Sequence, residues 1–188
     1  MTRLCAPEPV AYQIEAFNPG RHDTKHFRCG SDSQDNFLRR TAKRQQRDGY
    51  TRLYVATDAA QAGERRACLG FYALNAHAIG VADMPVDAAP RAPRSNLIPG
   101  VFLSHLAVDA RHQGKGLGRI LLVDAMQQCQ RAGQILGVRL MVLDVLGTAG
   151  EAQRVRLHGF YASMGFRPLP GHPERLFLSL RALPPLPS

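Results

Sequence analysis

The segment LAVDARHQGKGLGRILL, residues 106–122, decides the fold of this chain. A run rich in β-formers, Val101–Val108, leads into it, and a helix is expected to continue from the glycines to Gly133. Between the strand and the helix lies the glycine-rich stretch Gln113–Arg119. Glycines let the backbone approach a ligand closely, and a helix N-terminus presents unpaired N–H groups. The segment therefore predicts a strand–turn–helix unit whose main-chain amides bind phosphate oxygens.

Two familiar phosphate-binding loops do not match this segment. A Walker loop needs a hydroxyl residue after its lysine, but Gly116 follows Lys115 here. A dinucleotide fingerprint needs Gly-x-Gly-x-x-Gly, and the run from Gly114 to Gly118 is one residue short. Lys115 and Arg119 place positive charge where an anion would sit. A tight turn without any ligand would also use these glycines, so the wider context has to decide.

Composition limits the number of domains, the class of protein and the kinds of partner. The chain has 188 residues, 45% hydrophobic and 21% charged, which is enough for one domain with a real core. We expect a single domain over residues 1–182 and a flexible tail over 183–188. The net charge of +9 favours acidic partners such as nucleic acid or phosphate-bearing cofactors. Four scattered cysteines, no leader peptide and no long apolar run predict a reduced, cytoplasmic protein that uses no metal and no membrane.

Outward from the glycine-rich loop, hydrophobic periodicity and turn residues divide the chain into alternating elements. Strands are expected at 11–17, 52–57, 67–76, 138–146, 166–169 and 175–180, and helices at about 35–48 and 151–164. Four prolines make residues 82–100 a long connection. The helix at 35–48 has an apolar side with Phe37, Leu38 and Ala42. Its other side is basic, through Arg40, Lys43, Arg44 and Arg47.

The loop and a later segment together resemble the GNAT N-acetyltransferase superfamily. Its motif Gln/Arg-x-x-Gly-x-Gly/Ala is met by Gln113, Gly116 and Gly118, and the run FYASMGF, residues 160–166, is similar to the family's second hallmark. The resemblance implies an α/β GNAT fold with a mixed, mostly antiparallel sheet of six to seven strands flanked by helices. It implies acetyl-CoA as cofactor, with the pyrophosphate held by the loop and the pantetheine arm by the preceding strand. The implied contacts are Leu106, Ala107, Val108, Gln113, Gly114, Lys115, Gly116, Leu117, Gly118 and Arg119.

The resemblance also assigns a role to Tyr161. Acetyl transfer to an amine benefits from a proton donor to the departing thiolate, and Tyr161 matches the family's frequent general acid. Without the resemblance, a buried aromatic with a satisfied hydroxyl would be the simpler interpretation. No side-chain base stands out: His105 and His158 are candidates that a structural role explains at least as well, and many enzymes of this family deprotonate the amine through water. Asp144 either contacts the acceptor or caps a turn.

The N-terminal half resembles the GNAT toxins of bacterial toxin–antitoxin systems, which acetylate the amino group of aminoacyl-tRNA. Their early motif is matched by Phe27-Arg-Cys-Gly30 and then by Asp35, Phe37 and Leu38, although Gln34 replaces a leucine. The basic residues of the 35–48 helix could neutralise tRNA phosphates, or could form an ordinary solvated face. The longer run 147–158 could reshape the acceptor pocket.

We therefore expect an acetyl-CoA-dependent N-acetyltransferase acting on aminoacyl-tRNA, with a ribbon-helix-helix antitoxin as partner and a homodimer as a further possibility of the resemblance. An acetyltransferase for a small amine or a protein amino group is the alternative. A non-enzymatic module that binds acetyl-CoA or nucleic acid is a third hypothesis, against which Tyr161 and the intact loop both count.

Overall fold

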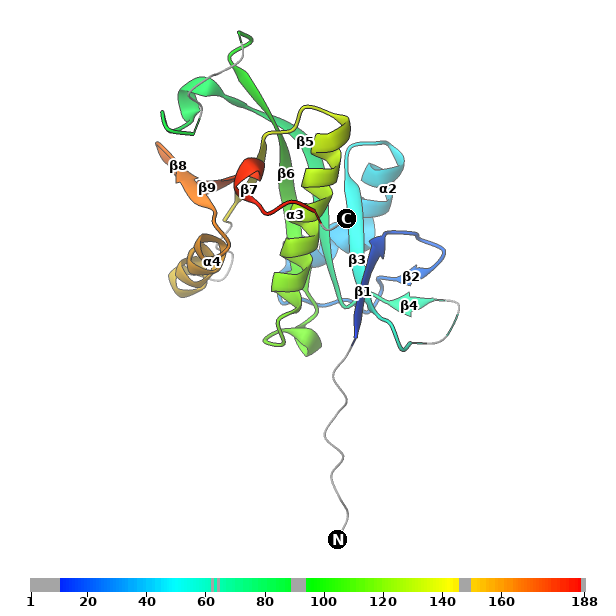
Figure 1. Cartoon of the computed structure of the whole chain (residues 1–188). Coiled ribbons are helices and arrows are strands. Elements are labelled where there is room, and N and C mark those ends of the chain that lie inside the picture. Colours follow the sequence, from blue (N-terminus) through cyan, green and yellow to red (C-terminus); the bar gives the residue numbers. More distant parts are fainter. Residues whose placement is uncertain (1–10, 62, 64, 89–93, 146–149, 187–188) are drawn as a thin grey trace.

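The computed structural model describes residues 11–61, 63, 65–88, 94–145 and 150–186. They build a seven-stranded sheet in the order β1-β3-β5-β6-β7-β9-β8, in which only β6 and β7 are parallel (Figure 1). This confirms the mixed, mostly antiparallel sheet. The strands are β1 (Tyr12–Ala16), β3 (Arg52–Asp58), β5 (Gly70–Gly80), β6 (Leu97–Val108), β7 (Leu140–Asp144), β8 (Arg167–Leu169) and β9 (His172–Ser179).

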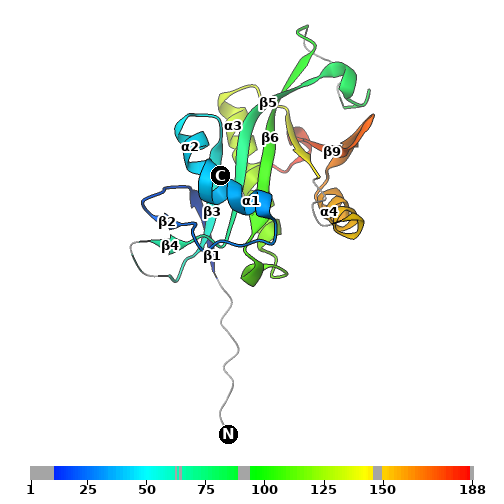
Figure 2. The ribbon, with the colours of Figure 1, turned by 180° about the vertical axis from the view of Figure 1, so that it is seen from behind.

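Helices cover the two faces of the sheet. Figure 1 shows α3 (Leu117–Ile135) in front of the central strands, and Figure 2 shows α1 (Asp32–Asn36) and α2 (Ala42–Arg47) on the opposite side. Apolar side chains at helical spacing on α3 are buried in one core cluster, to which α4 (Glu151–Ser163) contributes Tyr161. A second cluster, with Phe27, Phe37 and Phe71, fills the space under α1 and α2.

The predicted helix at 35–48 was wrong in its start and its regularity. The helical segment begins at Asp32 and is divided by one π-helical turn, Phe37–Thr41. The carboxylate of Asp35 is only 4% exposed and accepts a hydrogen bond from the Cys29 amide at 2.9 Å, so it holds the chain before the helix. The predicted apolar side was right, because Phe37, Leu38 and Ala42 are all buried.

The connection predicted at 82–100 is shorter than expected, because β6 begins at Leu97 and continues through Pro99. The carbonyl of Pro99 accepts from the Arg139 amide, on the β7 side of the strand. In a strand the nitrogen and the carbonyl of one residue point to the same side, so the missing N–H of Pro99 removes no bond to β5. The hairpin of β5 and β6 is therefore long, with partners from Gly70–Val108 to Gly80–Leu97.

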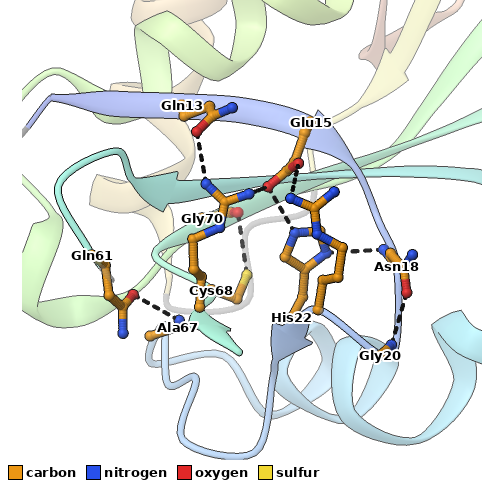
Figure 3. A network of polar contacts seen from close by, with 11 residues as sticks. Gln13, Glu15, Asn18, Gly20, His22, Gln61, Ala67, Cys68 and Gly70 are labelled. Atoms are coloured by element: carbon orange, nitrogen blue, oxygen red, sulfur yellow. Dashed lines mark hydrogen bonds and ion pairs between the residues drawn. The ribbon is translucent and has the colours of Figure 1, made fainter. Parts of the chain in front are cut away.

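A small parallel pair, β2 (His22–Asp23) with β4 (Arg66–Ala67), was not predicted. Figure 3 shows what holds it: the buried ring of His22 contacts the Glu15 carboxylate at 3.0 Å, and Arg66 pairs with the same carboxylate. The other ring nitrogen of His22 accepts from the Asn18 amide at 2.9 Å. Hydrogen bonding to His22, more than offsetting the effect of burial, lowers the pKa of Glu15. The network ties the β2–β4 pair to β1.

Candidate functional site

The glycine-rich loop forms a row of free main-chain donors. Gly114 and Gly116 have φ of 74° and 83°, a left-handed conformation that favours glycine, and Gly116 caps α3. Within the described part of the chain, the backbone N–H groups of residues 113–118 donate to no carbonyl or side chain. A Cβ on either glycine would meet no atom within 4 Å. The loop therefore has unpaired donors around open space at a helix N-terminus, the arrangement that binds phosphate.

The loop is anchored on both sides. The Gln113 side chain donates to the carbonyls of Val108 at 2.9 Å and Cys29 at 2.8 Å, which joins the loop to β6 and to the segment before α1. The buried Asp109 accepts from the amides of Arg28 and Arg111 and pairs with the Arg111 guanidinium at 2.7 Å. Burial would raise the pKa of Asp109, but these hydrogen bonds outweigh it and the pKa is lowered. The Asp109 carboxylate thus holds the start of the loop.

The two basic side chains of the loop differ in their environment. Lys115 donates to the Arg111 carbonyl at 2.9 Å, folding over the loop itself. Arg119 is exposed and lines a groove of about 470 Å³ along α3, whose other wall includes the end of α4 and residues Leu183–Leu186. Gln130 donates to the Pro184 carbonyl at 2.8 Å, so the described part of the predicted tail lies along α3. The predicted flexibility of residues 183–188 stays a prediction.

Strands β6 and β7 separate next to this loop. They pair only over Gly100–Phe102 and Leu140–Val142, after which a pocket of about 80 Å³ lies between them. The resemblance to the GNAT superfamily also implies a parallel pair of strands that splay apart near Leu106 and Leu143, and the structure has this arrangement. The pocket is lined by side chains from α1, β6, β7 and α4, with one residue just beyond β7: Gln34, Leu103, Ser104, His105, Leu106, Leu143, Asp144, Val145, Leu157 and Tyr161.

Tyr161 brings a buried phenol to the pocket. The residue is 8% exposed, and its ring packs edge-on to Phe166 at 5.7 Å. In the described part of the chain its hydroxyl makes no hydrogen bond, unlike the satisfied core tyrosine Tyr72, which donates to Asp124. Burial raises the pKa of Tyr161 to about 12. The phenol therefore stays protonated at neutral pH and has its proton available to a group inside the pocket.

His105 and Leu106 lie on opposite faces of the sheet, as the alternation along a strand requires, and a β-bulge precedes them. Ala73 pairs with His105 and Leu74 with Leu103, so Ser104 is the extra residue. The His105 ring stacks on Phe37, with centroids 3.5 Å apart, while Leu106 packs into the core on the α3 side. Burial lowers the pKa of His105 to about 4, which keeps the ring neutral at physiological pH.

The other polar candidates have structural partners. Asp144 lines the pocket but receives two hydrogen bonds from Arg175, at 2.7 and 2.8 Å. His158 contacts the Glu174 carboxylate at 3.0 Å and does not line the pocket. Part of the 147–158 run lies outside the described residues; the described part forms the first turns of α4 and contributes Leu157 to the pocket. Neither side chain offers a free base beside the Tyr161 phenol.

The basic residues expected on one helix side are exposed as predicted: Arg40, Lys43, Arg44 and Arg47. They lie on the α1–α2 side of the sheet, opposite α3 (Figure 2). Arg47 pairs with Asp48 at 2.9 Å. The basic residues therefore lie on the α1–α2 side of the sheet, whereas the glycine-rich loop lies between β6 and the start of α3.

Gln34 is the pocket residue that pattern reasoning missed. It precedes the buried Asp35 on a short helix, and one polar residue in a polar stretch carries no signal of burial. The one sequence signal at this position is that the early motif of the GNAT toxins has a leucine where this chain has Gln34. In the described residues, no cluster of three or more His, Cys, Asp or Glu side chains could hold a metal, and no helix is long and apolar enough to cross a bilayer.

Comparison with known proteins agrees with this geometry. The acetyltransferase (GNAT) domain model matches residues 49–168. The probable toxin TacT of Sinorhizobium fredii is 34% identical over 170 residues, which cover 90% of this chain and 92% of that protein. A structure of AtaT complexed with acetyl-methionyl-tRNAfMet superposes with a TM-score of 0.80 at 27% identity, covering 92% of this chain and 96% of AtaT.

A second similar structure is a tyrosine-to-phenylalanine mutant of the toxin AtaT, bound to acetyl-CoA and to the C-terminus of the antitoxin AtaR. It has a TM-score of 0.73 at 27% identity and covers 91% of this chain and 94% of that one. Family model, relative and fold agree over most of the chain. The chain belongs to the GNAT family of acetyltransferases.

Proposed function

We propose that this chain transfers the acetyl group of acetyl-CoA to the amino group of aminoacyl-tRNA and is the toxin of a toxin–antitoxin pair. The observation that carries the proposal is the row of free amides at residues 113–118 beside a pocket that contains a buried, protonated phenol. Acetyl transfer from coenzyme A requires a site that holds the cofactor's phosphates, and it benefits from a proton donor to the departing thiolate.

The loop fits the pyrophosphate of acetyl-CoA. The free N–H groups of residues 113–118 and the open space above Gly114 and Gly116 suit phosphate oxygens, and Arg119 adds charge beside them. Leu106, Ala107 and Val108 lie on the part of β6 that has separated from β7, where they would accompany the pantetheine arm. When bound, acetyl-CoA supplies a thioester whose acetyl group passes to an amine nitrogen as the carbon–sulfur bond breaks.

Tyr161 is the proposed general acid. Its phenol is protonated at neutral pH, it lines the pocket, and it has no competing hydrogen-bond partner among the described residues. A proton given from this hydroxyl would leave the products as an amide and a thiol. Because His105 is stacked on Phe37 and Asp144 is paired with Arg175, we assign deprotonation of the amine to water.

The acceptor follows from the basic face and from the relatives. Four exposed cations on the α1–α2 side could neutralise several phosphates of one nucleic acid strand. A similar structure holds an acetylated aminoacyl-tRNA, and others are toxins bound to an antitoxin. A tRNA acceptor also places the activity in the cytoplasm. We propose a ribbon-helix-helix antitoxin as partner and a homodimer as the assembled form.

The test is an incubation of the purified protein with radiolabelled acetyl-CoA and bulk charged tRNA, with uncharged tRNA and free amino acids in parallel reactions. Label that enters charged tRNA alone, and that is lost when the aminoacyl ester is hydrolysed, is the expected result. Label in free amines but not in charged tRNA would overturn the tRNA assignment and support a small-amine acetyltransferase instead.

A further inference from the structure

Gln34 has an amide oxygen that the fold leaves without a partner. Its Oε1 is buried and accepts no hydrogen bond within the described part of the chain, although its side chain lines the pocket between β6 and β7. A buried, unsatisfied carbonyl oxygen lowers the stability of the folded state, because it has lost its water without gaining a partner. Since an apolar residue would avoid that cost, a group from outside the chain is the natural partner for this oxygen.

The position of Gln34 indicates which substrate it meets. It comes from α1, which packs on the face of β6 opposite α3, whereas the free amides of the loop lie at the start of α3. The same helical segment continues into the exposed basic residues. Gln34 therefore lines the pocket from the α1 side of the sheet, the side that also has the exposed basic residues.

The pocket offers few other free acceptors for an N–H group. The Asp144 carboxylate is compensated by two hydrogen bonds from Arg175, and the Ser104 hydroxyl contacts Asn75 and the Ala73 carbonyl. His105 contacts the Ser104 hydroxyl through Nδ1 and stacks on Phe37, and its Nε2 has no hydrogen-bond partner among the described residues. Among these polar residues of the pocket, Gln34 is the one whose acceptor atom is buried and unpaired.

From this placement we propose that the Gln34 amide oxygen accepts a hydrogen bond from the substrate's amino group and orients it for acetylation. The inference rests on the proposed amine acceptor. A neutral amide suits the task because it favours the ammonium form, which has no lone pair to attack the thioester, much less than a carboxylate would. A carboxylate at the same place would favour the ammonium ion and raise the pKa of the amine.

The decisive experiment compares Gln34→Leu with the wild type in steady-state assays of coenzyme A release. We expect kcat/KM for the acceptor to fall about fivefold, the worth of one neutral hydrogen bond. The KM for acetyl-CoA should not change, and the Tm should be equal or higher because an unsatisfied oxygen has been removed. Gln45→Leu is the matched control: the same change on the same helical segment, at a half-buried residue outside the pocket.

A second variant, Gln34→Glu, tests the chemistry. In this variant, the acidic limb of the pH profile of kcat/KM should move to higher pH, because the carboxylate stabilises the protonated amine. In Gln34→Leu the acidic limb should stay at the wild-type pH. An unchanged kcat/KM in Gln34→Leu, a raised KM for acetyl-CoA, or a lowered Tm with a matching loss of activity would each overturn the proposal. If the wild type acetylates a small amine and no charged tRNA, the proposed function fails, but the Gln34 comparison can still be made on that amine.

Discussion

Burial acts in opposite directions on two titratable side chains of the pocket. It raises the pKa of the Tyr161 phenol to about 12 and lowers the pKa of the His105 imidazole to about 4. Both shifts favour the uncharged form, as low polarity requires. At neutral pH the pocket therefore holds a phenol with its proton and an imidazole without a charge.

Tyr161→Phe should lower kcat by about 100-fold or more, the usual effect of losing a general acid. Because the hydroxyl makes no hydrogen bond in the described part of the chain, the Tm should stay unchanged. The kcat of the wild type should not fall through phenol ionisation below about pH 10, because the raised pKa of Tyr161 keeps its phenol protonated there. Stopped assays at saturating acetyl-CoA measure the kcat of the variant and the pH dependence of the wild-type kcat. Tyr50→Phe, at an exposed tyrosine, is the control, and near-normal turnover of Tyr161→Phe would exclude the role.

In the loop before α3, residues 113–118, the backbone conformation itself exposes the N–H groups that we propose bind phosphate. Its left-handed glycines turn successive N–H groups away from the chain, and Gln113 and Asp109 hold the turn from both sides. A strand–turn–helix unit with these anchors is rigid before any ligand binds. Preorganised donors of this kind lower the cost of ordering on binding.

Gly114→Ala should weaken acetyl-CoA binding at least tenfold. The added Cβ meets no protein atom, but it enters the space where phosphate oxygens would lie, and the left-handed conformation costs a non-glycine residue about 1–2 kcal/mol. Gly171→Ala is the matched control: it has the same φ of 74° and open surroundings, and lies in the turn between β8 and β9. Calorimetry should find weaker binding only in Gly114→Ala, with a similar loss of Tm in both. Equal affinities would contradict the assignment of the loop.

At the scale of the molecule, the loop proposed to bind acetyl-CoA and the residues proposed to bind tRNA form two distinct surfaces. The glycine-rich loop lies at the start of α3, the basic residues lie on the α1–α2 side, and the pocket between β6 and β7 is lined by α1, β6, β7 and α4. A cofactor at the loop and a nucleic acid on the basic residues would then not compete for one surface. The excess of 24 Lys and Arg over 15 Asp and Glu favours association with polyanions.

Replacing Arg40, Lys43, Arg44 and Arg47 together by alanine should weaken tRNA binding and lower the slope of log affinity against log salt by up to about 3. These side chains are exposed, so the Tm and acetyl-CoA affinity should not change. The control removes the exposed Arg131 and Arg181, which lie on α3 and at the C-terminal end. Filter binding over a salt series measures the slope. The same slope in wild type and quadruple variant would show that tRNA binds elsewhere.

Much of the secondary structure could be predicted from local sequence. The glycine-rich loop, the α3 and α4 helices and the apolar side of the 35–48 helix follow from glycine conformation and hydrophobic period, which neighbouring residues alone impose. The long β5–β6 hairpin and the β2–β4 pair did not follow, because partners far apart in sequence decide them. From sequence alone, Pro99 is expected to interrupt a strand. In the structure its nitrogen faces β7 rather than β5, so the strand continues through it.

The sequence by itself determined that the chain has a glycine-rich strand–turn–helix and a tyrosine near the end of a later helix, because both depend on short-range geometry. The tertiary structure alone decided the pocket. The separation of β6 from β7, the bulge at Ser104 and the placement of Gln34 beside Tyr161 bring together four elements distant in the chain. Long-range packing sets which polar atoms lose their water, and burial in turn sets the pKa of Tyr161 and leaves the Gln34 oxygen without a partner.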